Sequence, residues 1–172
     1  LNAQNSPFFD KIMVFISGRI EWLPLYLFLI FFMFYRFRKK GWLFFALTLL
    51  VFALTDAGSV HLFKNVFERL RPCRNPDLQG MVHLVDGYCG GLYGFISSHA
   101  ANTFGLAVFM CLVFKEKWLV ISIIIWATVV SYSRIYLGVH YPLDVLCGAI
   151  WGSAMAAGVY FGFKRFTIDH RP

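Results

Sequence analysis

A histidine and a carboxylate in the C-terminal third of the chain have the types and spacing needed for nucleophilic chemistry. His140 precedes Asp144 by four residues, and Pro142 between them suits the first turn of a helix. His140 would then lie just outside that helix, with the Asp144 carboxylate within reach of its ring. An imidazole that donates one proton to a carboxylate presents its other nitrogen as an unprotonated nucleophile. Taken alone, such a histidine is more often an ordinary interfacial residue.

A second histidine follows two serines at the expected start of another helix. Ser97 and Ser98 precede an apolar segment, where a serine hydroxyl typically caps the helix. The free amides and the positive dipole end of such a helix bind phosphate, and either hydroxyl could add to them. Capping alone would explain the serines. His99 adds a titratable group at the same place.

Basic side chains on the segments expected outside the membrane could supply positive charge to an anion: Lys64, Arg69, Arg71, Arg74 and Arg134. On one helix, Lys64 and Arg71 would be about 10.5 Å apart along a single face, although Pro72 disfavours helix at Arg71. Together these two residues could hold one anion. The alternative for each single residue is an anchor to lipid phosphates.

The composition places these residues in a membrane protein. The chain has 172 residues, of which 59% are hydrophobic and 15% charged, and its mean hydropathy is +0.63. Soluble domains average about 25% charged residues, so lipid is the expected solvent and a disordered chain is excluded. The net charge of +7 does not indicate nucleic-acid binding, because that would require a basic stripe on a soluble surface.

Five apolar stretches predict an all-α bundle with about five transmembrane spans, in a single domain over residues 1–172. Four stretches lack charge, and a fifth, residues 41–63, contains only Asp56 and His61; the four are residues 22–35, 100–114, 118–133 and 145–163. Several are shorter than the roughly 20 residues that a bilayer requires, so flanking residues must contribute. No internal repeat is visible.

The N-terminal segment and the charges set the expected orientation. Residues 6–20 read as a helix with Pro7 at its first position, either lying in the membrane interface or forming the end of a span. Basic residues cluster at 36–40, 115–117 and 164–165, and the positive-inside rule places these ends in the cytoplasm. The loop region 66–96 and the turn at 136–142 would then face outward.

Three segments together resemble the signature of the type-2 phosphatidic acid phosphatase superfamily, KxxxxxxRP, PSGH and SRxxxxxHxxxD. They are Lys64 to Pro72, Ser97-Ser98-His99, and Ser133-Arg134 through His140 to Asp144. The first and third parts match completely. In the second part Ile96 replaces proline and Ser98 replaces glycine, which bears on how closely the backbone can approach a phosphate.

The resemblance implies a role for each matching residue. His140 would be the nucleophile that forms a phosphohistidine, Asp144 would orient it, and His99 would be the general acid and then the general base. The phosphate would be held by Lys64, Arg71, Arg134, Ser97 and the amides near Ser98 and His99. Three fixed cations can replace a metal, and the outward segments show no metal-ligand spacing, so activity without metal or cofactor is expected.

The expected substrate is a membrane lipid that carries a phosphate or diphosphate, because the site would lie at the depth of the lipid headgroups. Small bacterial members of the family act on undecaprenyl diphosphate, lipid A 1-phosphate or phosphatidylglycerophosphate, and we favour the first two. The expected location is a bacterial inner membrane, with the site facing the periplasm. Alternatives are a phosphotransferase that passes phosphate between lipids and, outside enzymes, an anion channel or transporter subunit. The sequence does not fix the oligomeric state.

The remaining polar and small residues give three structural expectations. Cys73 and Cys89 share the outward connection and are expected to form a disulfide. Asp56, the acid within a span, is expected to form a buried hydrogen bond to a serine or threonine of a neighbouring helix rather than to relay protons. The small residues of the last span indicate close helix packing, with dimerisation as the alternative: Gly148, Gly152, Ala156, Gly158 and Gly162.

Overall fold

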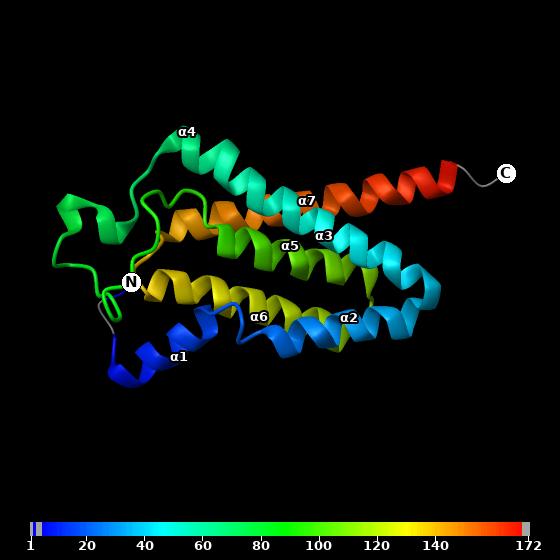
Figure 1. Cartoon of the computed structure of the whole chain (residues 1–172), viewed down its shortest axis with the longest axis horizontal. Helices are drawn as coiled ribbons and strands as arrows, with labels where there is room; N and C mark the ends of the chain where they lie inside the picture. Colours follow the sequence, from blue (N-terminus) through cyan, green and yellow to red (C-terminus); the bar gives the residue numbers. More distant parts are fainter. Residues whose placement is uncertain (1, 3–4, 170–172) are drawn as a thin grey trace.

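A computed structural model describes Asn2 and residues 5–169 as a bundle of helices, and the described residues contain no strand (Figure 1). The α-helices are α1 (Pro7–Ser17), α2 (Leu23–Phe37), α3 (Gly41–Gly58), α4 (Asn65–Phe67), α5 (Ser98–Val113), α6 (Lys117–Tyr136) and α7 (Pro142–Asp169). Shorter segments join them: η1 (Arg38–Lys40), the π-helical η2 (Ser59–Lys64), η3 (Pro72–Arg74) and η4 (Pro76–Leu78). The expected all-α architecture is confirmed.

Five apolar helices correspond to the five expected spans. Three helical runs are long and apolar enough to cross a membrane, namely 23–67, 117–136 and 142–165, and α5 is a shorter apolar helix. The first run is a hairpin, because the chain reverses at Arg38, where φ is 54°, so that α2 and α3 run side by side (Figure 1). Large apolar side chains such as Phe31 and Ile150 remain exposed on the bundle, as expected for helices that face lipid.

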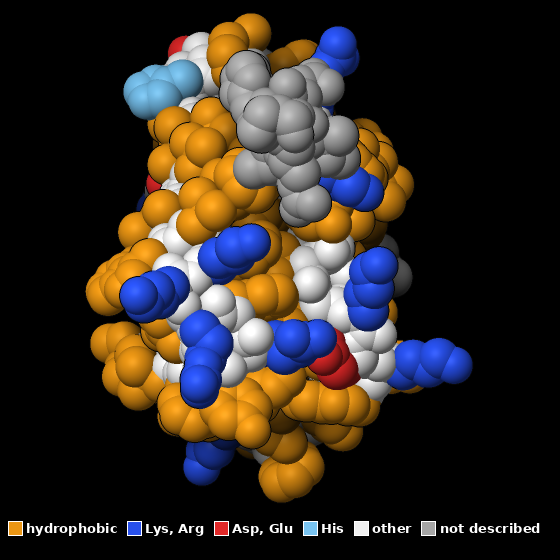
Figure 2. All heavy atoms as spheres, turned by 90° about the vertical axis from the view of Figure 1, so that its right-hand side faces the viewer, with side chains coloured by type: hydrophobic (Ala, Val, Ile, Leu, Met, Phe, Trp, Pro, Cys, Tyr) orange, Lys and Arg blue, Asp and Glu red, His pale blue; other side chains and the backbone are white. Residues whose placement is uncertain are grey.

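Basic side chains ring one end of the bundle. Figure 2 shows this end, which carries the α2–α3 turn and the α5–α6 turn. We call it the basic end and the opposite end, where α5 and α7 begin, the site end. The predicted cytoplasmic position of the basic end rests on this gathering of lysine and arginine side chains.

Helix α5 occupies the centre of the bundle and packs most closely on α7. The backbone of α7 approaches α5 at Gly148 and Gly152: a Cβ at Gly148 would lie 2.5 Å from the Ser97 carbonyl oxygen, and one at Gly152 would overlap the Ala101 carbonyl. Ala156 is fully buried on the same side. Beyond it the pattern changes, since a Cβ at Gly158 or Gly162 would meet no described atom within 4 Å. Close helix packing is therefore confirmed for the first three small residues and wrong for the last two. A side chain on either of those glycines would point into open space.

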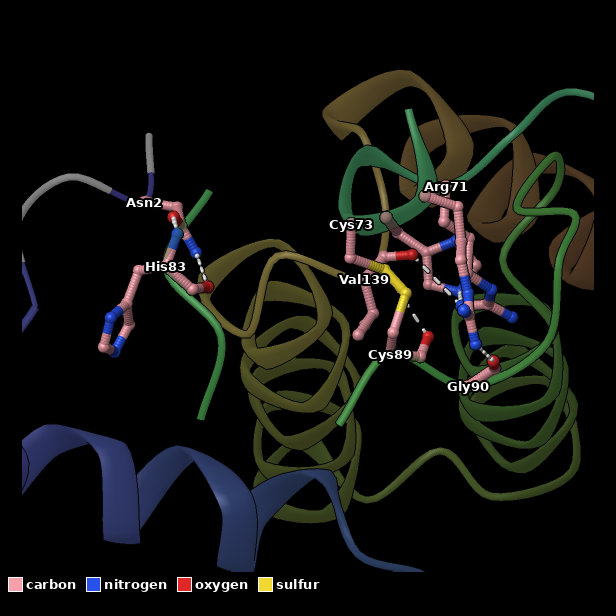
Figure 3. Close-up of a disulfide and its surroundings, with 9 residues drawn as sticks. Asn2, Arg71, Cys73, His83, Cys89, Gly90 and Val139 are labelled. Carbon is pink, nitrogen blue, oxygen red and sulfur yellow. Dashed lines mark hydrogen bonds between the residues drawn. A yellow bond between two sulfur atoms is a disulfide. The ribbon is translucent and has the colours of Figure 1, made fainter. Parts of the chain in front are cut away.

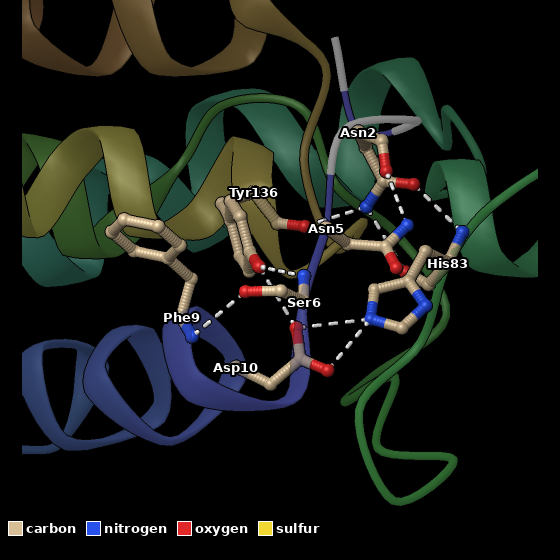
Figure 4. A network of polar contacts seen from close by, with 7 residues as sticks. All are labelled: Asn2, Asn5, Ser6, Phe9, Asp10, His83 and Tyr136. Atoms are coloured by element: carbon tan, nitrogen blue, oxygen red, sulfur yellow. Dashed lines mark hydrogen bonds and ion pairs between the residues drawn. The ribbon is translucent and has the colours of Figure 1, made fainter.

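The N-terminal helix is attached to the site end by polar contacts. Ser6 caps α1 by accepting a hydrogen bond from the Phe9 amide, and Asp10 accepts one from the Tyr136 hydroxyl at 2.9 Å (Figure 4). His83 from the outer loop lies 3.0 Å from the same carboxylate. The helix ends at Ser17 rather than at residue 20, because Gly18 adopts an extended backbone.

The connection between α4 and α5 is irregular and is held by a few cross-links. The disulfide between Cys73 and Cys89 forms as expected, with the two Cα atoms 5.9 Å apart (Figure 3). An isolated backbone bridge pairs Leu70 with Tyr93. Glu68 adopts a left-handed backbone with φ of 45° and ends the helical run at Phe67. The chain therefore turns away before Arg71, the arginine of the first signature segment.

The α5–α7 packing gives a test of the fold. We expect Gly152→Ala to lower the melting temperature of the detergent-solubilised protein, because its methyl group would enter the α5 backbone and overpacking typically costs about 1–3 kcal/mol. Gly158→Ala on the same helix is the matched control, and it should be neutral or slightly stabilising. Equal melting temperatures for the two variants would contradict this packing.

Candidate active site

The three segments of the signature converge at the site end. The Ser97 amide donates a hydrogen bond to the Asp144 carbonyl at 2.9 Å, which joins the start of α5 to the start of α7. The Arg71 amide donates to the Leu92 carbonyl and thereby holds the segment before η3 against the loop that leads into α5. Segments that lie far apart in the sequence are thus brought to one place.

His140 and Asp144 form the centre of this arrangement, and both are buried. The Asp144 Oδ2 atom lies 3.5 Å from His140 Nδ1, and the other ring nitrogen, Nε2, lies 3.0 Å from Arg71 NH1. Because a guanidinium can only donate, Nε2 must be the acceptor and the ring proton must lie on Nδ1, toward the carboxylate. This is the tautomer expected of a nucleophilic imidazole.

Arg71 lies directly on the nitrogen that would attack. The same NH1 atom donates to the Val139 carbonyl at 3.0 Å, so the guanidinium is fixed against the loop that carries His140. Burial, together with the positive charges of Arg71 and Arg134, lowers the pKa of His140 to about 4, whereas Asp144 opposes the shift. His140 is therefore neutral at physiological pH.

Lys64 reaches the site through a π-helical turn. Its Nζ atom donates to Ser98 Oγ at 2.5 Å, and Ser59 Oγ lies 2.7 Å from the same hydroxyl. In an α-helix, residues 59 and 64 would be about 140° apart around the axis. The i→i+5 winding of a π-helix brings them to one side. The expectation that Lys64 and Arg71 share one helical face is wrong, because the helix ends between them.

The two serines have different positions. The Ser97 hydroxyl accepts a hydrogen bond from the Ala100 amide at 3.4 Å and so acts as the N-cap of α5. The Ser98 hydroxyl contacts Lys64 instead. Of the pair, Ser98 has its hydroxyl on the cationic side chain of Lys64, and Ser97 caps the helix terminus.

His99 and Arg134 complete the set of predicted residues. Arg134, at the end of α6, is 5% exposed and donates a hydrogen bond to Ser17 Oγ. His99 lies close enough to Arg134, Lys64 and His140 to interact electrostatically with each of them. Both imidazoles therefore lie near the same group of cations, which is the geometry that a shared phosphate requires.

Arg69 is a contact of Asp144 that sequence reasoning missed. Its NH1 atom lies 3.1 Å from Asp144 Oδ1, and its guanidinium stacks over the Tyr141 ring at 4.2 Å. The Tyr141 amide donates to Asp144 Oδ2 at 2.8 Å. The carboxylate is therefore held on both oxygens. In the sequence, Arg69 is one of the basic residues expected outside the membrane. Its spacing does not distinguish it from a lipid anchor.

Asp56 has a different partner from the one expected. Its Oδ1 atom accepts a hydrogen bond from Asn102 Nδ2 at 3.1 Å, and the Asn102 carbonyl oxygen accepts one from the Thr55 hydroxyl at 2.6 Å. The partner is thus an asparagine of α5 rather than a serine or threonine. The amide suits this position because it can donate to the carboxylate and accept from the threonine at once.

Comparison with known proteins places the chain among phosphatases. Residues 40–168 match the model of the PAP2 superfamily. A lipid A 4'-phosphatase from Bacteroides thetaiotaomicron is 38% identical over 173 residues, covering 99% of this chain and 74% of the relative. An undecaprenyl-diphosphatase from Sulfolobus acidocaldarius is 36% identical over 149 residues, covering 84% of this chain and 66% of the relative.

A solved structure has the same fold. The crystal structure of a transmembrane PAP2-type phosphatidylglycerolphosphate phosphatase from Bacillus subtilis superimposes with a TM-score of 0.69 and 27% identity, covering 99% of this chain and 82% of that chain. The similarity therefore includes the helices of the bundle and the segments that build the site.

The contact between Arg69 and Asp144 predicts a kinetic effect. We expect Arg69→Ala to lower kcat by about tenfold or more with little change in KM, because the loosened carboxylate no longer fixes the His140 ring and small misplacements of catalytic groups are costly. Arg69→Lys should restore part of the rate. Arg74→Ala, which removes an arginine whose side chain bonds to the Gly90 carbonyl, is the control. A change confined to KM would contradict the positioning role.

The lowered pKa of His140 predicts its titration. In protein labelled with 15N-histidine, the ring signals absent from His140→Gln should titrate with a midpoint near pH 4, with the protonated form below and the neutral form above. An exposed histidine would titrate near 6.5. A His140 midpoint at or above that value would show that the ring is not held in this buried cationic setting.

Proposed function

The chain belongs to the PAP2 superfamily and is a membrane lipid phosphatase of that type, and we propose that it hydrolyses its substrate through a phosphohistidine at His140. The observation that carries the proposal is the state of the imidazole. It is neutral, its Nδ1 atom lies 3.5 Å from Asp144 Oδ2, and its Nε2 lone pair accepts a hydrogen bond from Arg71. A ring in this tautomer can attack phosphorus once Arg71 has moved off Nε2.

In the first step, Nε2 of His140 attacks the phosphorus atom. The new N–P bond forms as the bond between phosphorus and the leaving oxygen breaks, and His99, which takes up a proton when the phosphate anion binds beside it, gives this proton to that oxygen. The NH1 atom of Arg71 now lies on Nε2, so the guanidinium must move onto a phosphate oxygen as the attack begins. Asp144 balances the positive charge that develops on the ring.

In the second step, a water molecule displaces His140 from phosphorus. His99, now neutral, takes a proton from the water molecule, whose oxygen attacks phosphorus as the N–P bond breaks. Inorganic phosphate leaves, and His140 and His99 return to their starting protonation states. Lys64, Arg71 and Arg134 compensate the charge on the phosphate oxygens throughout. We propose that these cations make a metal or other cofactor unnecessary.

The favoured substrate is a lipid A phosphate. The relative named as a lipid A 4'-phosphatase aligns with 99% of this chain, which supports the 4'-phosphate instead of the 1-phosphate that the resemblance brought forward. Undecaprenyl diphosphate is the second candidate, because a relative named for it aligns with 84% of the chain. Transfer of the phosphoryl group to another lipid would use the same first step and differ only in the acceptor.

The proposed location is the inner membrane of a bacterium with the site end facing the periplasm. The gathering of lysine and arginine at the basic end supports this orientation (Figure 2). The substrate phosphate would then meet the site end at the depth of the outer headgroups.

The central test is removal of each imidazole. We expect His140→Ala and His99→Ala to abolish release of inorganic phosphate from lipid A in detergent micelles while the melting temperature stays close to that of the wild type. His61→Ala, at an exposed histidine of η2, is the control and should retain activity. Labelled substrate should leave a base-stable, acid-labile phosphoryl group on His99→Ala if the first step still occurs slowly, and never on His140→Ala. Full activity in His140→Ala would remove the proposed nucleophile.

A further inference from the structure

A long cavity extends from His99 into the bundle. It has a volume of about 550 Å³ and runs between α2, α3, α5 and α6. The helices α2 and α3 meet at their turn at the basic end and diverge toward the site end (Figure 1). The residues of α5 that line it extend from His99 to Met110, about 16 Å along the helix. A cavity of this size and depth can hold part of a lipid.

The wall of the cavity changes character along its length. Beside His99 it carries the charged and amide side chains of Arg19, Asp56 and Asn102. Deeper in the bundle it is lined almost entirely by apolar side chains, among them Leu29, Met33, Val51, Leu106 and Met110. A ligand that fills it must therefore have a polar part next to His99 and an apolar part below.

Asp56 is the feature that specifies the polar part. Asn102 fixes one oxygen of its carboxylate, whereas the second oxygen has no hydrogen-bond partner among the described residues. A carboxylate in a membrane-spanning helix is costly unless it is hydrogen-bonded. The free oxygen is a hydrogen-bond acceptor on the wall of the cavity. A ligand that binds there should therefore carry a hydrogen-bond donor.

The position of this acceptor relative to the reacting phosphorus indicates which part of the substrate lies in the cavity. In the proposed function, on which this inference rests, His99 gives its proton to the leaving oxygen, so the leaving group lies on the His99 side of the phosphorus. The cavity begins at His99. We infer that the cavity binds the leaving group and that Asp56 accepts a hydrogen bond from one of its hydroxyl or amide N–H groups.

This assignment selects a chemical class of substrate. A phosphorylated, acylated sugar has both parts, because its ring hydroxyls and acylamino groups can donate to Asp56 and an acyl chain can enter the apolar part. A diphosphate of an isoprenoid alcohol has no sugar hydroxyl or amide N–H to donate, and its leaving phosphate would meet the negative charge of Asp56. Arg19 lies at the same mouth, but its side chain is exposed and its charge is therefore more strongly screened.

The experiment compares two phosphate monoesters in the same micelles. Lipid A offers the sugar donors, and phosphatidic acid carries acyl chains without them. The readout is the ratio of kcat/KM for lipid A to kcat/KM for phosphatidic acid. We expect Asp56→Ala to lower this ratio about tenfold and Asp56→Asn to lower it less, since an amide oxygen still accepts a hydrogen bond but without charge. Glu68→Gln, an exposed acid outside the cavity, is the matched control.

Each outcome has a separate meaning. A ratio that stays constant while both activities fall would show that Asp56 only supports the fold, and it would overturn the inference. Wild-type protein that hydrolyses phosphatidic acid but not lipid A would also overturn it, while leaving the lipid phosphatase function intact. If the wild type released phosphate from neither lipid nor from undecaprenyl diphosphate, the proposed function itself would fail.

Discussion

The buried carboxylate of Asp144 is the constraint on which the site end depends. A negative charge with no exposed surface is tolerated only when charged and polar partners surround it. Arg69 and the Tyr141 amide hold its two oxygens, and the His140 ring lies beside it. Its own backbone carbonyl receives the Ser97 amide. One residue thus fixes the start of α7, the start of α5 and the segment before η3, and these are the pieces that must meet for phosphate to be held and attacked.

The packing of the bundle supports the same arrangement from below. Gly148 and Gly152 let the backbone of α7 approach α5 in the N-terminal halves of both helices, so the N-terminus of α5 lies beside the loop that carries His140. Larger residues there would separate the two helices and with them the two imidazoles. The last glycines of α7, Gly158 and Gly162, lie outside this contact. Close approach is needed only where helix packing also determines the geometry of the site.

Much of this could be predicted from the sequence, because caps, apolar stretches and the three-part signature depend on local residue types. Ser6 and Ser97 cap the helices that follow them, and the expected cysteines pair. The errors arose where the local winding changes. The π-turn that turns Lys64 toward Ser98 and the left-handed Glu68 have no marker in residue spacing. Contacts between distant segments, such as Arg69 with Asp144 and Asn102 with Asp56, depend on the tertiary fold and could not be predicted from one sequence.

The cross-link between Cys73 and Cys89 has a consequence for how the enzyme matures. It lies two residues beyond Arg71 and closes the adjacent loop, residues 73–89 (Figure 3). Thiols pair only in an oxidising compartment, so in a newly made chain in the reducing cytosol the loop next to Arg71 would still be open. If the site end faces the periplasm, as proposed, this constraint beside Arg71 is completed only after the segment has crossed the membrane.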